Sequence, residues 1–262
     1  MIFGMQLIFY KYQGTGNDFV LVDNRQQIFP KNNTKLIAFL CDRKFGIGAD
    51  GLILLENDEL SDFKMVYYNS DGNESSMCGN GGRCIVAFAK KMGVIENATT
   101  FNAIDGIHKA IIEGDVVTLQ MIDVDDIKAK SKYLFLDTGS PHHVQFVEGL
   151  NELDVVKEGA KLRYGIYGQA GCNINFVKAV NSNTFEIRTY ERGVEDETLS
   201  CGTGVTAVAL AMHHTGKAND NHIYIHTKGG KLEVTFDHEN GVYTNVNLIG
   251  KANFVFKGEI SC

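Results

Sequence analysis

The sequence has 262 residues, 44% of them hydrophobic, so it can bury a full core as one large domain or as two smaller ones. Its formal net charge of −7 argues against sequence-independent binding of nucleic acid, which requires clustered Lys and Arg side chains. No apolar run is long enough to cross a membrane, and the N-terminal segment M-I-F-G-M-Q-L-I-F-Y-K-Y lacks the features of a signal peptide, so we read it as a strand. We therefore expect a soluble cytoplasmic protein that acts on a small molecule, with no nucleic-acid or membrane partner.

Short strand-like segments, separated by turns rich in Gly, Asn and Asp, run along most of the chain. In chain order the predicted strands are residues 7–12, 19–23, 52–56, 63–68, 108–113, 116–121, 133–137, 143–147, 173–180, 184–190, 223–227 and 231–236. Helical periodicity is best over residues 34–41, 82–92 and 204–214. The last two helices lie among strands and have an apolar face that requires a sheet around it. The pattern predicts an α+β fold of two pseudo-symmetric domains, each a sheet wrapped around a central helix.

A polar, charged segment at residues 125–132, D-D-I-K-A-K-S-K, marks the predicted domain boundary. We expect residues 1–130 to form the first half, which contains Cys78, and residues 131–250 to form the second half, which contains Cys201. The tail, residues 251–262, is expected to return to the first half.

Six cysteines in a chain of this length are too few for a disulfide scaffold, and in a reducing compartment we expect them to be thiols. Cys78 and Cys201 share one pattern, in which cysteine, glycine, any residue and glycine directly precede a predicted helix. Either cysteine alone would be interpreted as structural. At a helix N-terminus, however, unpaired backbone N–H groups and the helix dipole stabilise a thiolate. Cys41, Cys84 and Cys172 lack this setting and are interpreted as core residues.

The sequence contains no spacing typical of a zinc site and no glycine-rich nucleotide loop, so we expect neither a metal nor a cofactor. Its adjacent histidine pairs, His142-His143 and His213-His214, point in different directions on a strand or a helix. Such pairs rarely serve as two ligands of one metal.

The N–H groups at the two helix N-termini can also hold a carboxylate, because glycine lets the backbone approach closely. If both N-termini face one amino acid, a thiol lies on each side of its α-carbon. A thiolate on one face can then remove the α-proton while a thiol on the other face delivers a proton, which inverts the stereocentre. The repeated cysteine motif therefore favours a cofactor-independent epimerase or racemase with two bases.

Several motifs between residues 11 and 204 resemble the diaminopimelate epimerase family. In order they are K-Y-Q-G-T-G-N-D-F, D-R-K-F-G-I-G-A-D-G, Y-N-S-D-G-N-E-S-S-M-C-G-N-G-G-R-C, T-G-S-P-H, N-I-N-F and Y-E-R-G-V-E-D-E-T-L-S-C-G-T-G. The resemblance implies an isomerase, independent of pyridoxal phosphate, that interconverts LL- and meso-diaminopimelate in lysine and peptidoglycan precursor biosynthesis. It also implies two pseudo-symmetric α/β domains with the site between them, and a homodimer.

The resemblance also assigns roles by position in these motifs. Cys78 and Cys201 match the base and acid pair. The backbone N–H groups that hold the reacting carboxylate belong to Gly79, Asn80, Gly202 and Thr203. The polar residues that read the substrate's amino and carboxylate groups are Asn17, Asn69, Asn173, Glu191 and Arg192, and His142 matches a histidine near the catalytic pair. Arg192 also suits its role physically, because a guanidinium group binds a carboxylate with two hydrogen bonds.

Some of these residues have a simpler interpretation when the residues alone are considered. Asn17 and Asn69 suit turns, and His142 suits a loop. Glu191 and Arg192 suit a solvated surface pair that stabilises the fold by less than about 1 kcal/mol.

Two positions depart from the pattern of the family. Gly51 stands where Gln is frequent and Ser140 where Asn is frequent, which leaves distal substrate recognition open there.

The residues are also compatible with three different functions. The nearest is a racemase of the same fold for another amino acid, such as histidine. The second is a thiol redox or metal-binding protein that uses the same cysteines. The third is an isomerase of this fold that works without thiols.

Overall fold

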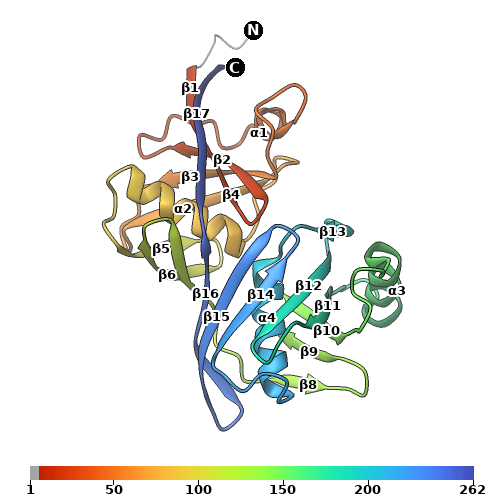
Figure 1. Ribbon diagram of the computed structural model, residues 1–262. Coiled ribbons are helices and arrows are strands. Elements are labelled where there is room, and N and C mark those ends of the chain that lie inside the picture. The colour runs from red at the N-terminus through yellow and green to blue at the C-terminus, as the bar shows by residue number, and fades with distance from the viewer. Residues whose placement is uncertain (1–5) are drawn as a thin grey trace. The chain divides into compact units, whose positions relative to one another are not determined.

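The computed structural model describes residues 6–262, so the first five residues of the segment read as a strand lie outside the described residues. The chain forms two compact units (Figure 1). Unit 1 contains the residues up to Leu119 together with Lys251–Cys262, and unit 2 contains Gln120–Gly250. These units are defined by packing, and the division into two epimerase halves at residue 130 stays a prediction.

Unit 1 combines helices with a mixed sheet. Its helices are α1 (Thr34–Cys41) and α2 (Gly79–Lys91), and its strands are β1 (Gln6–Gly14), β2 (Asn17–Asp23), β3 (Gly51–Glu56), β4 (Phe63–Asn69), β5 (Ala98–Ala103), β6 (Gly106–Glu113), β7 (Val116–Gln120) and β17 (Asn253–Ser261). Neighbouring strands pair in the order β17-β1-β2-β3-β4-β5-β6-β7. The β2–β3 and β4–β5 pairs are parallel, and the other pairs are antiparallel.

Unit 2 repeats this arrangement. Its helices are α3 (Val155–Tyr167) and α4 (Gly202–His214), and its strands are β8 (Ile127–Ala129), β9 (Leu134–Asp137), β10 (Pro141–Phe146), β11 (Asn173–Ala179), β12 (Thr184–Glu191), β13 (Asp196–Thr198), β14 (His222–Thr227), β15 (Gly230–Glu239) and β16 (Val242–Lys251). The strands pair in the order β8-β9-β10-β11-β12-β14-β15-β16, and β13 pairs with the end of β12. Again two pairs are parallel, β10–β11 and β12–β14. The shared sequence of pairings confirms the predicted α+β fold with two similar halves.

One helix of each unit lies within its sheet and the other lies outside it. Helix α2 contacts β1, β2, β3 and β6, and α4 contacts β9, β10, β11, β12, β14 and β15. On the outer face of the sheet in unit 1, Ile37 of α1 belongs to the same apolar cluster as Val20 and Leu52. In unit 2, Val155 of α3 belongs to a cluster with Ile174. Each sheet therefore wraps around a central helix, α2 or α4, as predicted.

The two central helices begin earlier than predicted. They start at Gly79 and Gly202, whereas the periodicity predicts starts at Gly82 and Gly204. Glycine has a low helix propensity, so the first turn of each helix is invisible to periodicity and is stabilised by tertiary contacts instead.

Helix α3 is missing from the sequence prediction. Its N-cap residue, Asp154, accepts a hydrogen bond from the Lys157 N–H (3.0 Å). Its buried residues are Val155, Gly159 and Arg163, so a glycine and a charged residue interrupt the apolar pattern of its buried face. Gly159 is required by close packing, because a Cβ there would collide with the side chain of Tyr190.

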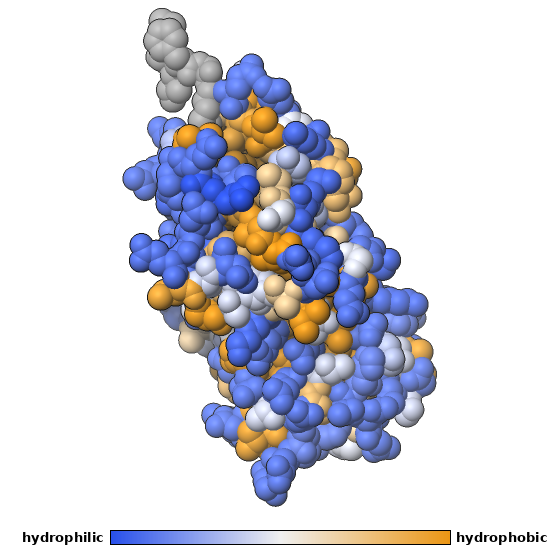
Figure 2. Space-filling view, turned by 90° about the vertical axis from the view of Figure 1, so that its left-hand side faces the viewer, coloured by the Kyte–Doolittle hydropathy of each residue, from blue (hydrophilic) through white to orange (hydrophobic). Residues whose placement is uncertain are grey.

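One face of the molecule is predominantly polar. Figure 2 shows a face on which hydrophilic residues, coloured blue, outnumber the apolar residues between them. Over residues 6–262, none of the helices has the length and apolar character needed to span a membrane.

Candidate active site

Cys78 is the N-cap residue of α2, with extended backbone angles (φ −107°, ψ 148°). Its sulfur accepts a hydrogen bond from the Gly81 N–H at 3.2 Å. A sulfur that caps a helix receives both a hydrogen bond and the positive end of the helix dipole, and both favour its anionic form. Gly79 and Asn80 follow directly as the first residues of the helix, as their predicted role requires.

A buried arginine stabilises the first turn of α2 through hydrogen bonds. Arg83 is fully buried and donates to the Gly79 carbonyl (3.1 Å), to Asn80 Oδ1 (2.9 Å) and to Thr15 Oγ1 (3.3 Å). Burial lowers the pKa of its guanidinium group. Asn80 is also buried, so its side chain supports this turn, while its backbone N–H lies at the helix N-terminus.

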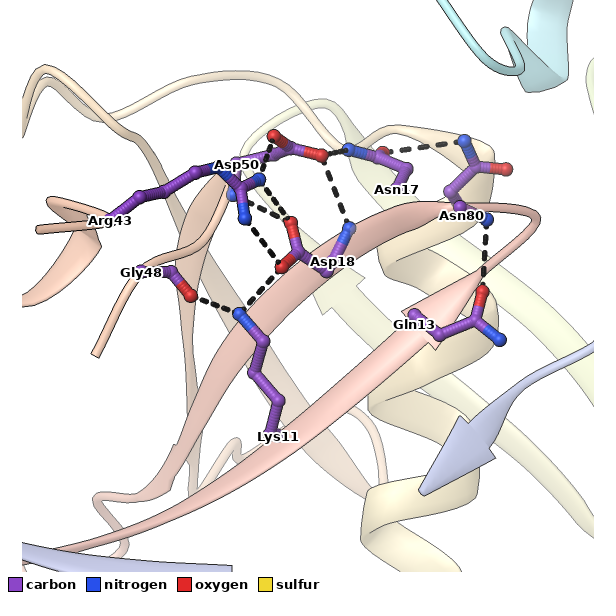
Figure 3. Close-up of polar contacts among 9 residues, drawn as sticks. Lys11, Gln13, Asn17, Asp18, Arg43, Gly48, Asp50 and Asn80 are labelled. Atoms are coloured by element: carbon purple, nitrogen blue, oxygen red, sulfur yellow. Dashed lines mark hydrogen bonds and ion pairs between the residues drawn. The ribbon is translucent and has the colours of Figure 1, made fainter. Parts of the chain in front are cut away.

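Asn17, the first residue of β2, lies beside this helix N-terminus. Its Oδ1 accepts a hydrogen bond from Asn80 Nδ2 at 3.3 Å and lies 4.0 Å from the Cys78 sulfur. On its other side, Asn17 Nδ2 donates to Asp50 Oδ2 at 2.6 Å (Figure 3). The structure therefore brings Asn17, Cys78 and Asn80 together, and the turn interpretation of Asn17 is wrong because the residue is in a strand.

Asn69 ends β4, opposite Gly51 on β3. The Asn69 N–H donates to the Asn73 carbonyl, and the Asn69 carbonyl accepts from the Gly72 N–H, both at 2.9 Å. The backbone of Asn69 thus begins a turn. A Cβ at Gly51 would lie 2.5 Å from the Tyr68 carbonyl oxygen, so this position has a steric reason to be glycine.

Cys201 is the N-cap residue of α4, again with an extended backbone (φ −117°, ψ 112°). It is 7% exposed, and its sulfur lies 3.4 Å from the Thr203 hydroxyl. The Thr203 carbonyl accepts a hydrogen bond from Thr138 Oγ1 (2.9 Å), which ties the start of α4 to the end of β9. Gly202 and Thr203 form the first turn of this helix, as Gly79 and Asn80 do in α2.

A neutral hydrogen-bonded chain lies beneath the first turn of α4. His142 is on β10, not in a loop, and it is fully buried. Its Nδ1 accepts from Asn175 Nδ2 (3.0 Å), and Asn175 Oδ1 accepts from Thr189 Oγ1 (3.0 Å). Burial, with a smaller contribution from the charge of Arg192, lowers the pKa of His142 to about 3, so the imidazole is neutral at ordinary pH.

Gly204 allows α4 to approach this chain. A Cβ at Gly204 would lie 2.5 Å from Asn175 Oδ1, and 3.4 Å from both His142 Cε1 and Cys201 Cβ. His142 Nε2 is buried and has no hydrogen-bond partner among the described residues. The structure therefore places His142 next to the first turn of the helix that Cys201 caps.

Asn173 and Arg192 meet at the adjoining ends of β11 and β12. Asn173 Oδ1 accepts from the Arg192 backbone N–H at 2.8 Å, and Arg192 Nη1 donates to the Ala170 carbonyl at 3.0 Å. Glu191 ends β12, and its carbonyl accepts from the Glu195 N–H (2.8 Å) to close the following turn. Asn173 thus fixes the backbone from which the Arg192 side chain extends.

Three residues that sequence reasoning missed support the predicted ones. Arg83 stands four residues after Gly79, a spacing that places both on one helix face. Asn175 stands two residues after Asn173 on a strand, and so faces the same side of the sheet. Those spacings were visible in the sequence. Asp50, which binds Asn17, gave no local signal.

Comparisons with known proteins identify the family of this chain. Residues 9–124 and 134–255 match the diaminopimelate epimerase family. A diaminopimelate epimerase of Flavobacterium psychrophilum is 65% identical over 253 residues, covering 96% of this chain and 99% of that protein. One of Chlorobaculum tepidum is 40% identical over 259 residues, covering 95% and 99%.

Solved structures show the same fold at low sequence identity. A Bacillus anthracis phenazine biosynthesis protein of the PhzF family superposes with a TM-score of 0.79 at 12% identity, covering 98% of this chain and 99% of that one. A hydroxyproline epimerase from Agrobacterium vitis superposes with a TM-score of 0.72 at 16% identity, covering 98% and 92%.

Proposed function

Because this chain belongs to the diaminopimelate epimerase family and is an isomerase, we propose that it interconverts LL- and meso-diaminopimelate, without a cofactor, by proton transfer at the α-carbon. One observation carries the mechanism: each cysteine of the repeated motif is the N-cap residue of the central helix of its unit. The reaction supplies lysine and peptidoglycan precursor biosynthesis.

The proposed chemistry uses Cys78 and Cys201 as a base and an acid. One cysteine, as thiolate, takes the α-proton, so that a carbon–hydrogen bond breaks and an S–H bond forms. The electron pair moves into the carboxylate as an ene-diolate. The other cysteine, as thiol, gives its proton to the opposite face and becomes the thiolate. The two residues exchange protonation states, and the substrate leaves with inverted configuration.

The difficulty of this reaction is the weak acidity of an α-proton beside an ionised carboxylate. Preorganised N–H donors lower the barrier, and removal of one such donor typically costs about 3 to 4 kcal/mol. We assign this role to the backbone N–H groups of Gly79, Asn80, Gly202 and Thr203, all in the first turns of the two helices. Reaction on both faces requires both helix N-termini to meet one substrate.

The remaining polar residues are proposed to recognise the substrate. The exposed Arg192 side chain suits a distal carboxylate, with Glu191 beside it for an ammonium group. We assign Asn17, Asn69 and Asn173 to substrate contacts on the family resemblance. His142 is kept neutral by burial, so we propose that it contacts the Cys201 side of the site as an uncharged ring.

Homodimer formation remains a prediction of the family resemblance, and a cytoplasmic location remains a prediction of the sequence. Strand β17 exposes Phe254, Val255 and Phe256, which would suit a contact with a second copy. The molar mass in solution, measured by light scattering after size exclusion, tests the dimer.

The function is tested with purified protein and LL-diaminopimelate in D2O. We expect deuterium at the α-carbon, seen by NMR, together with meso product, seen by chiral chromatography. Exchange with another amino acid, such as histidine, and none with diaminopimelate would support a racemase of different specificity. Zinc or iron bound at one equivalent after purification under reducing conditions, without exchange activity, would support a thiol redox or metal-binding protein.

A further inference from the structure

Four charged residues of unit 1, Lys11, Asp18, Arg43 and Asp50, form a cluster on the side of Asn17 away from Asn80, which we call the ionic cluster (Figure 3). Arg43 Nη2 lies 2.7 Å from both Asp18 Oδ1 and Asp50 Oδ1, and Lys11 Nζ lies 2.7 Å from Asp18 Oδ2. The two positive and two negative charges balance. The carboxylates of Asp18 and Asp50 can therefore lie side by side without net repulsion.

The backbone fixes the position of Asp50. Its N–H donates to the Asp18 carbonyl (2.9 Å) and lies 3.1 Å from Asp18 Oδ1, while the Asp18 N–H donates back to Asp50 Oδ2 (3.2 Å). Asp18 is itself anchored by its contacts with Arg43 and Lys11. Burial alone would raise the pKa of its carboxyl, but these two partners outweigh burial and lower the pKa to about 2. Lys11 is buried and also donates to the Gly48 carbonyl.

Asp50 determines which way the amide of Asn17 faces. Its Oδ2 accepts from Asn17 Nδ2 at 2.6 Å, and an ionised carboxylate can only accept, so the NH2 group of Asn17 must point to Asp50. The Asn17 carbonyl oxygen then points the other way, to Asn80 Nδ2 at 3.3 Å and to the Cys78 sulfur at 4.0 Å. On the other side, Asn80 favours the same orientation, because Arg83 binds its Oδ1 and leaves its NH2 group to face Asn17. Without the acceptor at Asp50, the 3.3 Å bond from Asn80 alone would hold the Asn17 amide in this orientation.

We propose that Asp50, held by Arg43 and Asp18, is a positioning residue that keeps an acceptor, the Asn17 carbonyl oxygen, directed at the N-terminus of α2. The acceptor suits a group that donates, such as the substrate's ammonium group or the Cys78 thiol. This inference rests on the proposed function only for the roles of Cys78 and Asn17. The orientation of the Asn17 amide is inferred from its contacts within unit 1 and does not depend on the proposed function.

The first experiment measures kcat/KM of Asp50→Asn with diaminopimelate. The variant has nearly the same shape, but its own NH2 group can face Asn17 and reverse the amide. Loss of one hydrogen bond to a charged group predicts a decrease of about 10- to 100-fold. The matched control is Asp23→Asn, which removes a carboxylate paired with Arg25 (2.7 Å) at the other end of β2 and is expected to change kcat/KM less than about twofold.

A double-mutant cycle separates positioning from structure. If Asp50 acts through Asn17, Asp50→Asn introduced into Asn17→Ala lowers kcat/KM by less than about twofold further, because the residue being positioned is gone. Equal losses in both backgrounds would overturn the proposal, since a structural defect does not depend on Asn17.

The second experiment needs no substrate. In 15N-labelled protein, the side-chain NH2 signals that disappear in Asn17→Ala belong to Asn17, and their hydrogen exchange reports the bond to Asp50. We expect slow exchange in the native protein and faster exchange in Asp50→Asn, with the Asp23→Asn control unchanged. Unaltered Asn17 signals in Asp50→Asn would overturn the proposal. A native protein inactive on diaminopimelate but with these NMR results would instead refute the proposed function alone.

Discussion

The two central helices start with the same cysteine and glycine motif, but different chemistry supports each start. At α2 the support is ionic, with Arg83 buried below Asn80 and the ionic cluster beside Asn17. At α4 it is neutral, a buried chain from His142 through Asn175 to Thr189. The two units thus share the helix N-terminus with its cysteine N-cap, but the side chains that support this N-terminus differ between them. Charged and neutral supports respond differently to acid, so we expect the stability of the two helix N-termini to depend differently on pH. The atoms packed around them also differ, so we expect a larger side chain to destabilise them unequally.

The largest effect is expected from removal of either thiol. Cys78→Ala and Cys201→Ala should each lower epimerisation by about 10²- to 10⁴-fold, the usual contribution of a positioned acid or base. Deuterium exchange of each stereoisomer sharpens the comparison, because the thiol that remains should still exchange the α-proton of the isomer facing it. Cys84→Ala is the control: it removes a fully buried side chain of α2 and should lower stability but keep turnover. Full activity of either alanine variant would support an isomerase that works without thiols.

Acid should loosen unit 2 before unit 1. The folded pKa of His142 is depressed from 6.5 to about 3, so between these values the unfolded chain binds a proton that the folded chain does not. Stability is therefore lost as pH falls below 6.5, by about 2 kcal/mol at pH 5. His143, with a pKa lowered to about 4 by burial, acts in the same direction.

In unit 1 the group considered is Asp18 of the ionic cluster, which titrates at lower pH than His142. The pKa of Asp18 is depressed from 3.8 to about 2, so its contribution, on the order of 2 kcal/mol, is present above 3.8 and is lost only as pH falls towards 2. Hydrogen exchange at pH 7 and pH 5, corrected for intrinsic rates, should show α4 losing protection while α2 keeps it. His142→Gln should reduce that loss. Earlier loss in α2 would contradict the assignment of a neutral support to α4.

Alanine at the equivalent glycines Gly81 and Gly204 should have unequal effects. At Gly204 the new Cβ would lie 2.5 Å from Asn175 Oδ1 in a fully buried chain, and such overpacking typically costs about 1 to 3 kcal/mol. At Gly81 the nearest atoms are Cys78 Sγ, Ile53 Cδ1 and Met65 Cε, all at 3.3 Å, and the last two are the ends of flexible side chains. The gain in helix propensity, up to about 1 kcal/mol, can offset this contact. Urea unfolding of the two variants measures the difference, and equal destabilisation would refute it.

The smallest effect is expected at Thr203. Thr203→Val keeps the shape of the side chain but removes the hydroxyl 3.4 Å from the Cys201 sulfur. One neutral hydrogen bond contributes about 1 kcal/mol, so kcat should fall about fivefold. The rate of Cys201 alkylation as a function of pH, with Thr203→Ser as the control that keeps the hydroxyl, reports whether the hydroxyl acts on the thiol. Identical profiles for both variants and the native protein would exclude this.

The parts of the fold and site that could be predicted are those encoded locally. The motif around Cys78 and Cys201 combines a thiol, a flexible turn and an apolar helix within a short stretch, and it led to both central helices and to the α+β fold. Helix α3 escaped prediction because Gly159 and Arg163 interrupt the apolar pattern of its buried face, and the packing of these two residues depends on partners elsewhere in unit 2.

The sequence spacing shows which face Asn175 lies on, but the contacts of Asp50 and Asn175 could not be predicted because they depend on strand register. Asp50 is 33 residues from Asn17, and Asn175 is 33 residues from His142. Each pair meets where one parallel strand pair aligns, β2 with β3 or β10 with β11. No local spacing records that alignment, so Asp50 stayed unnoticed although its motif was among those that carried the family resemblance.

The return of β17 to β1 has a consequence for synthesis on the ribosome. Unit 2 is one continuous stretch, Gln120–Gly250, whereas unit 1 needs Lys251–Cys262 to supply the strand that pairs with β1 along Gln6–Gln13. Because translation begins at the N-terminus, the half that contains Cys78 is synthesised first. Its strand β1 has no partner on one edge until the half that contains Cys201, and then β17, have been translated. The half that starts first is therefore completed last, and during that interval its exposed β1 edge is the place where a chaperone or a second nascent chain can bind.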